Sequence, residues 1–239
     1  MKNIFTFILI LFSFGCVESN QASSENTIPQ ETKEVFENWF QSQQTSEVAK
    51  NVLKTNFYVV LDGSGSMDES TCADGSTKQV VARKALQEFS KTLPSEYNLG
   101  LLAFDSDGIT ERLPLGTSNR DAFIQAVNSV KADSGTPLET AITKGYEKLA
   151  LQAKKQQGYG EYHLVVVTDG EPSMGEDPAK IVKTIATGTP VIMHTLGFCI
   201  SANHVLNSNF VDFKPANNPK ELVKGLKEVI TESLSFKTN

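Results

Sequence analysis

Residues 57–66 read FYVVLDGSGS, and this stretch decides the fold class. Phe57 to Leu61 form a continuous apolar run rich in β-branched and aromatic residues, which is typical of a strand buried on both faces of a parallel sheet. Asp62 ends the run, and Gly63 and Gly65 follow it with residues typical of a tight turn. The stretch therefore predicts a central strand followed by a loop of small polar side chains.

Strand-like and helix-like stretches alternate around this one. A second buried run, residues 163–168, also ends on an aspartate, Asp169. Turn residues at 105–108 separate two strand-like stretches and predict a hairpin. The alternation predicts one α/β domain, with a mostly parallel sheet, one antiparallel edge strand and helices on both faces. The remaining strands are expected at 99–104, 109–115, 191–196 and 210–213, and the helices at 76–93, 121–131, 138–155, 178–186, near 204 and 219–234.

The composition bounds the class of protein. The chain has 239 residues, of which 39% are hydrophobic, so it can build one core of ordinary size. Its 22 basic and 28 acidic residues give a formal net charge of −6 without a lysine- or arginine-rich block, so nucleic acid is not expected as a partner. Three cysteines are too few for a disulfide scaffold, and a single long apolar run excludes a polytopic membrane protein.

That apolar run, residues 4–12, lies at the amino terminus behind Lys2. A short basic end, an apolar stretch of this length and small residues after it are typical of a secretory signal, and the run is too short to span a bilayer comfortably. Cys16, directly after Gly15, resembles the lipobox cysteine of bacterial lipoproteins, which becomes the lipidated first residue. We expect a signal peptide at 1–15 and an exported protein anchored by lipid on the periplasmic or cell-surface side; a plain signal peptide is the alternative.

The segment between the anchor and the domain has two parts. Residues 16–33 are rich in Ser, Asn, Gln, Glu and Thr and are expected to form a disordered tether. Apolar residues then recur at helical spacing from Val35 to Phe40, which predicts a lead-in helix within residues 34–54 that packs on the domain. A partner-binding helix carrying Trp39 is the alternative. The domain itself is expected at 55–236.

Three loops carry small oxygen donors to one edge of the predicted sheet. In such sheets ligands bind where the strands have their carboxyl ends. No histidine or cysteine stands in the three loops, and hard oxygen donors suit Mg²⁺, Mn²⁺ or Ca²⁺. The sequence therefore predicts a site for a hard dication made of Asp62, Ser64, Ser66, Thr136 and Asp169.

Each loop also has an explanation that involves no metal. Thr136, Pro137 and Glu139 match a capping box at the start of the helix at 138–155. Asp62 and Asp169, each followed by glycine, match strand-end turns. The occurrence of all three motifs together favours the metal site.

Asp-x-Ser-x-Ser at 62–66, Gly-Thr-Pro at 135–137 and Thr-Asp-Gly at 168–170, in this order, resemble the metal-ion-dependent adhesion site of the von Willebrand factor A domain. The resemblance covers about residues 55–236 and implies a three-layer, Rossmann-like fold. It also implies that Ser64 and Ser66 coordinate the ion directly and that Thr136 joins them when ligand is bound. Asp62 and Asp169 would then act through water or through hydrogen bonds to the serines.

A site of this kind predicts a binding function. Neutral ligands leave much of the charge of the ion unbalanced, so an Asp or Glu carboxylate of a partner protein can complete the coordination. We expect a metal-dependent adhesion or complex-assembly module of the bacterial envelope and no enzyme. The alternatives are a metal-assisted hydrolase with Glu171 as general base, and a module whose ion is purely structural.

The remaining cysteines and histidines lead to weaker predictions. Cys72 and Cys199 both lie in loops expected at the metal edge of an exported domain, where a disulfide can form if the Cα atoms come within about 4.4–6.8 Å. Their strands are expected two places apart in the sheet, roughly 10 Å, so the sequence does not decide whether the two cysteines are bonded. His163 and His194 are expected to be structural, and His204 to be a surface residue.

Overall fold

The central strand of the sheet is β1 (Thr55–Asp62), the apolar run with which the sequence analysis began. The structure, a computed structural model, describes residues 47–201 and 203–235. Six strands lie in the order β3-β2-β1-β4-β5-β6, and all neighbours are parallel except β2 and β3. The other five strands are β2 (Asn98–Asp105), β3 (Gly108–Gly116), β4 (Glu161–Thr168), β5 (Val191–Phe198) and β6 (Asp212–Ala216).

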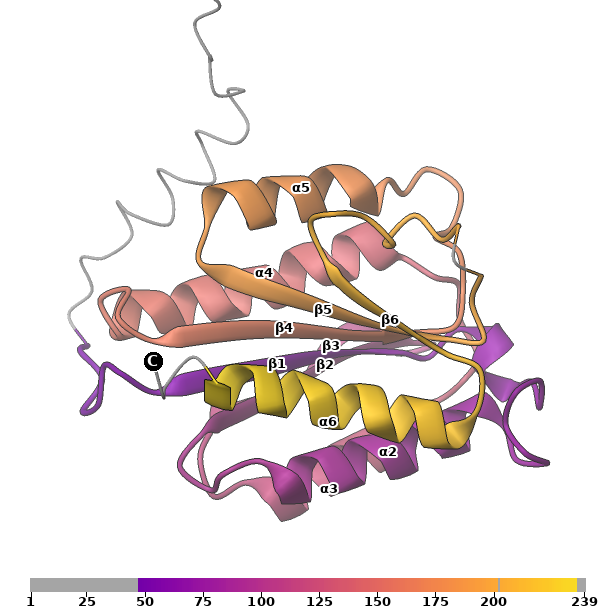
Figure 1. Ribbon diagram of the computed structural model, residues 1–239, viewed down its shortest axis with the longest axis horizontal. Helices are drawn as coiled ribbons and strands as arrows, with labels where there is room; N and C mark the ends of the chain where they lie inside the picture. Colours follow the sequence, from indigo (N-terminus) through magenta and orange to yellow (C-terminus); the bar gives the residue numbers. More distant parts are fainter. Residues whose placement is uncertain (1–46, 202, 236–239) are drawn as a thin grey trace, which may run out of the picture.

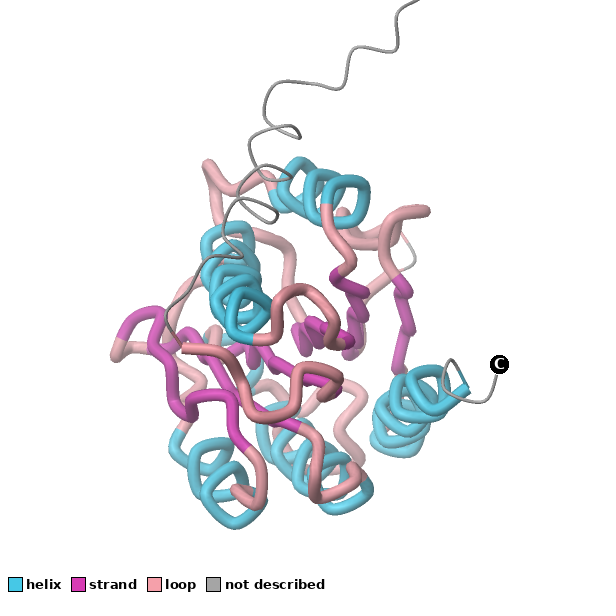
Figure 2. Tube along the Cα trace, turned by 90° about the vertical axis from the view of Figure 1, so that its left-hand side faces the viewer, coloured by secondary structure: helices cyan, strands magenta, loops and turns pink. Residues whose placement is uncertain are grey.

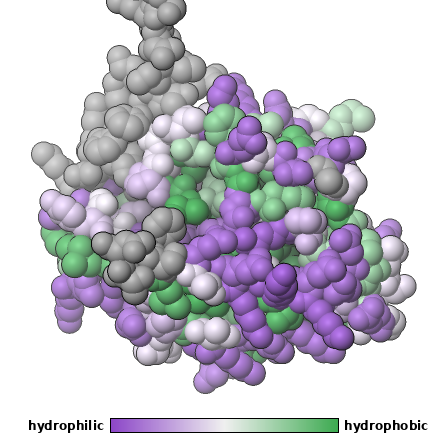
Figure 3. Space-filling view, in the orientation of Figure 1, coloured by the Kyte–Doolittle hydropathy of each residue, from purple (hydrophilic) through white to green (hydrophobic). Residues whose placement is uncertain are grey.

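Helices cover both faces of this sheet (Figures 1 and 2). On one face lie α2 (Lys78–Thr92), α3 (Arg120–Ser129) and α6 (Pro219–Ser235), and on the other α4 (Leu138–Lys155) and α5 (Pro178–Gly188). The outer surface over α6 is largely hydrophilic (Figure 3), with exposed charged residues such as Lys224 and Glu228. This arrangement confirms the predicted fold class, including the antiparallel edge strand.

The alternation of side chains in β1 explains its continuous apolar sequence. Phe57, Val59 and Leu61 pack in the core beneath α2, α3 and α6, whereas Tyr58 and Val60 pack in the core on the opposite face. All of these side chains are fully buried. A strand covered on both faces has no solvent side, so it needs no polar alternation.

Three expected elements differ from the structure. The residues around His204 form turns and no helix, and β6 begins at Asp212, two residues later than expected. The described part of the expected lead-in helix, residues 47–54, is also wrong: it is extended and turned. The amide side chain of Gln156 donates to the carbonyls of Val52 and Lys54 at 2.9 and 2.8 Å and so holds this turn against the end of α4.

The expectations for residues 1–46, namely the signal peptide, Cys16, the tether and the start of the lead-in helix, lie outside the described residues. Among the residues that the structure describes, no helix has both the length and the apolar character needed to cross a membrane.

Candidate metal centre

The carboxyl ends of β1 and β4 lie next to each other in the sheet, because Leu61 pairs with Val167. The loops that follow these strands therefore start at the same edge, on the right in Figure 1. Asp62, the last residue of β1, is fully buried. One carboxylate oxygen accepts from the Ser64 backbone N–H at 2.7 Å, and the other accepts from the Thr168 hydroxyl at 2.5 Å. Asp62 thus links the two loops from beneath.

Above Asp62 the hydroxyls of two loops lie near the carboxylate of a third. The Oγ atoms of Ser64 and Ser66 lie 3.0 Å apart, and Ser66 donates to Asp169 at 2.8 Å. The Ser66 hydroxyl oxygen and the Thr136 hydroxyl oxygen each lie 3.5 Å from the point where a Cβ on Gly170 would stand. The structure therefore brings together all five residues of the predicted site.

Backbone hydrogen bonds hold the loop of Thr136 against the first loop. Gly65 N–H donates to the carbonyl of Ser134 at 2.8 Å, and Asp133 N–H donates to the carbonyl of Gly63 at 3.0 Å. A Cβ at Gly63 would stand 2.4 Å from one backbone oxygen, that of Lys131, and 2.5 Å from another, that of Phe104. Only glycine fits such a close approach of the chains.

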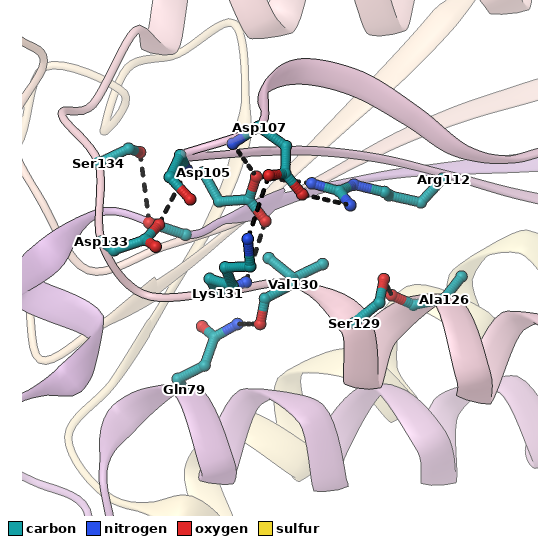
Figure 4. Close-up of polar contacts among 12 residues, drawn as sticks. Gln79, Asp105, Asp107, Arg112, Ala126, Ser129, Val130, Lys131, Asp133 and Ser134 are labelled. Carbon is teal, nitrogen blue, oxygen red and sulfur yellow. Dashed lines mark hydrogen bonds and ion pairs between the residues drawn. The ribbon is translucent and has the colours of Figure 1, made fainter.

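Two aspartates of the predicted hairpin hold the same loop from the other side (Figure 4). The buried Asp105 carboxylate accepts from the Lys131 backbone N–H at 3.0 Å and pairs with Arg112 at 2.6 Å. Asp107 pairs with the Lys131 ammonium at 3.1 Å, and Ser106 N–H donates to Asp133 at 2.8 Å. The turn after β2 therefore also positions the segment that leads to Thr136.

The capping-box interpretation of Thr136 is wrong. The N-cap residue of α4 is Pro137, which makes no capping hydrogen bond of its own, and the first-turn N–H of Thr140 donates to the carboxylate of Glu176 at 2.9 Å. Glu139, which should reach back in a capping box, accepts instead from the backbone N–H of Asp177 at 2.8 Å. The Thr136 side chain lies instead beside Gly170.

The surroundings of the site shift the pKa values of two charged residues, Asp62 and Lys78. Burial raises the pKa of Asp62 to about 6, against the opposing effect of hydrogen bonds from Ser64 and Thr168, and the charge of Asp169 raises it further. Lys78 places its ammonium 2.8 Å from Asp169 and 3.0 Å from Glu69. Burial alone would lower the pKa of Lys78, but its bonds to these two carboxylates outweigh burial and raise it.

The donor set fits a hard dication. Both carboxylates use their oxygens on protein donors, so the hydroxyl oxygens of Ser64, Ser66 and Thr136 are the groups available to an ion. Oxygen-only donors at a partly open edge suit Mg²⁺, Mn²⁺ or Ca²⁺ and disfavour softer metals.

A disulfide ties two further loops at this edge. The Sγ atoms of Cys72 and Cys199 are 2.01 Å apart, and their Cα atoms are 5.9 Å apart. β5 does lie two places from β1, as expected, so the two loops lean toward each other. The bond connects the segment between the serine loop and α2 with the segment after β5.

Sequence reasoning missed two residues beside the site. The first is Lys78, whose side chain is buried and therefore needs an anionic partner. His204 is buried, which makes the expectation of a surface residue wrong. Its Nε2 lies 3.0 Å from the carbonyl of Gly170, and its Nδ1 accepts from Leu206 N–H at 3.2 Å, so the ring supports the loop of Asp169.

A separate group lies where the middle of β5 pairs with the first residue of β6. His194, Asp212 and Glu232 have possible ligand atoms within 4.8 Å of one another. The Lys214 ammonium bonds to both carboxylates, at 3.0 Å to Asp212 and 2.9 Å to Glu232, and so occupies the position of a cation. The group stabilises the contact between β6 and α6, and His194 has the structural role that the sequence indicated.

Comparisons with known proteins identify the family and the fold. The sequence profile of the von Willebrand factor type A domain matches residues 56–226. The uncharacterized protein YwmD of Bacillus subtilis (strain 168) is 29% identical over 167 residues, which cover 64% of this chain and 72% of YwmD.

Two solved structures share the fold. The pilus adhesin SpaC from Lactobacillus rhamnosus GG superposes with a TM-score of 0.59 at 17% identity, over 78% of this chain and 31% of SpaC. The conserved hypothetical protein BatB from Bacteroides thetaiotaomicron superposes with a TM-score of 0.58 at 15% identity, over 74% of this chain and 99% of BatB.

Proposed function

Because this chain belongs to the von Willebrand factor type A domain family, we propose that it is a lipid-anchored, metal-dependent protein-binding module of the bacterial cell envelope. The hydroxyls of Ser64, Ser66 and Thr136 would hold Mg²⁺, or Mn²⁺ or Ca²⁺ in its place. When bound, the ion supplies a positive charge that an Asp or Glu carboxylate of a partner protein neutralises. The module would act in adhesion or in the assembly of a larger complex.

The main support for this proposal is that the carboxylates of Asp62 and Asp169 accept hydrogen bonds from the protein itself. Asp62 accepts from the loop backbone and from Thr168, and Asp169 accepts from Ser66 and Lys78. Neutral hydroxyls are then left to face an ion, and they balance less of its charge than carboxylates do. An acidic residue of another protein is the chemical complement of such a site.

The proposed location rests on the sequence and on similarity. The basic and apolar amino terminus and Cys16 are typical of an exported lipoprotein, although they lie outside the described residues. One solved structure with this fold is a pilus adhesin, and another is an aerotolerance-related membrane protein from Bacteroides fragilis. These similarities support a role in protein recognition at the cell envelope.

We prefer binding to hydrolysis because of the groups beside the site. The Glu171 side chain is 65% exposed and lies 3.7 Å from His204 Nε2. Both ring nitrogens of His204 take part in hydrogen bonds with the backbone. A general base needs an available lone pair directed at the substrate, and the backbone contacts of His204 use both of its ring nitrogens.

The proposal is tested by capture of partners from envelope extract on immobilised protein, with Mg²⁺ or with EDTA. We expect a protein that is retained only with Mg²⁺ and is lost with Ser66→Ala. Ser70→Ala, which removes an exposed hydroxyl from the same loop, is the matched control and should retain the partner. Capture that is indifferent to EDTA and to Ser66→Ala would leave only a structural ion, and turnover of a phosphoester or peptide substrate would favour the hydrolase.

A further inference from the structure

Lys78 is a buried charge directly beside the candidate metal centre. It is the first residue of α2, and its side chain is only 6% exposed. Burying an ammonium group is costly unless anionic partners surround it. The partners of Lys78 are Asp169, Glu69 and the more distant carbonyl of Ser66, at 2.8, 3.0 and 3.5 Å.

The contact with Asp169 matters most, because the side chain of Asp169 is completely buried. Its Oδ1 accepts from the Ser66 hydroxyl and its Oδ2 accepts from Lys78. Each oxygen of this carboxylate therefore already accepts a hydrogen bond from a protein donor. The ammonium also offsets the negative charge that Asp169 would otherwise direct at a cation.

We propose that Lys78 is a positioning residue that keeps Asp169 out of direct metal coordination and weakens metal binding, so that a carboxylate from the partner is needed to complete the site. This inference rests on the proposed function. If Lys78 only stabilised the start of α2, it would not weaken metal binding. Its removal would then loosen the site and reduce the affinity for the metal.

The two roles predict opposite signs for one measurement. In Lys78→Met, which keeps an apolar stem of similar length, Asp169 is free to turn toward the ion. We expect the affinity for Mn²⁺, measured by calorimetry on the full chain, to rise by about tenfold or more, which is the size of effect that outer-shell partners have on metal sites. The added gain in Mn²⁺ affinity that a short Asp-containing peptide gives should shrink, because Asp169 already supplies the negative charge.

Lys84→Gln is the matched control, because Lys84 is an exposed lysine of the same helix. It removes the same charge from the chain and should leave the Mn²⁺ affinity unchanged, whereas Lys78→Arg keeps a cation beside Asp169 and should behave as wild type. If wild type binds Mn²⁺ and folded Lys78→Met binds it equally or more weakly, the inference is wrong and the proposed function stands. If wild type binds none of Mn²⁺, Mg²⁺ and Ca²⁺, the proposed function fails, and the inference with it; if it binds only Mg²⁺ or Ca²⁺, the same comparison is made with that ion.

A second measurement needs no variant. In a crystal structure of the wild-type protein with Mn²⁺, Lys78 Nζ should remain in hydrogen-bond contact with Asp169 Oδ2, as in the 2.8 Å contact described above. A direct bond between Asp169 and the ion, with Lys78 displaced, would overturn the inference even if Lys78→Met failed to fold.

Discussion

Asp62 makes the candidate site depend on pH. Without metal, burial raises its pKa from the ordinary value of 3.8 to about 6. At a pH between these two values, Asp62 is protonated in the folded chain and ionised in the unfolded chain. The free energy of unfolding of the metal-free protein should therefore fall as pH rises from about 4 to about 6, by at most about 3 kcal/mol.

Metal binding should show the opposite trend, because a cation favours the ionised carboxylate. We expect the affinity for Mg²⁺ to rise between pH 5 and pH 7 and the binding reaction to release protons in this range. Calorimetry in two buffers of different ionisation enthalpy counts these protons. Asp62→Asn should remove the pH dependence along with most of the affinity; a wild-type affinity that is the same at pH 5 and pH 7 contradicts this account of Asp62.

The residues that the sequence predicted for the site share one property. Asp62, Ser64, Ser66, Thr136 and Asp169 all follow or precede elements whose ends could be located from apolar patterns. Lys78 and His204 could not be found in this way. Their roles depend on contacts with Asp169 and Gly170, which lie far from them in the sequence and become neighbours only in the folded sheet.

Between elements, the close packing of loops is what assembles the hydroxyls. Gly63 lets the serine loop approach the backbone of the segment before Thr136, where a Cβ would stand 2.4 Å from the Lys131 carbonyl oxygen. Gly63→Ala must push these loops apart. We expect it to cost about 1–3 kcal/mol of stability and to lower Mn²⁺ affinity by at least about tenfold.

Gly65→Ala is the control for this substitution. Its Cβ would lie 3.9 Å from the nearest atom, the Ser134 carbonyl oxygen, so the chain can accept it. Urea denaturation and Mn²⁺ titration of both variants give the comparison. Equal behaviour of the two alanine variants would show that the close approach at Gly63 has no part in forming the site.

Element positions were predictable where a buried face repeats regularly. The expected helix at 138–155 matches α4 at both ends, because its apolar residues face the sheet at regular spacing. The prediction of a lead-in helix is wrong in its described part. Val48 and Leu53, on whose apolar character it depended, are 52% and 67% exposed and do not pack on the domain as expected. Residue type indicates which side chains can pack, but the partner that they pack against comes from the rest of the fold.

Across the whole molecule, the disulfide joins segments that are 127 residues apart in sequence. A cross-link over a loop of about 100 residues restricts the unfolded chain by roughly 4.7 kcal/mol in the loop-entropy account. We expect the Cys72→Ser, Cys199→Ser double variant to lose about 3–5 kcal/mol in urea denaturation.

The reduced wild-type protein should lose the same amount, and the reductant should leave the double variant unaffected. A wild-type chain with equal stability in oxidising and reducing buffer would contradict a stabilising role for this bond. The sequence left the pairing open because it depends on how far two loops lean together, and strand order alone does not determine that distance.

The proposed function of the whole molecule depends on a cation that hydroxyl groups from separate loops hold. Calorimetric titration of Mg²⁺ into the purified protein tests this most directly, with Ser66→Ala and Thr136→Ala beside the wild type. We predict saturable binding by the wild type that either substitution weakens by about tenfold or more. Absence of binding to Mg²⁺, Mn²⁺ and Ca²⁺, or binding that both substitutions leave unchanged, would contradict the account.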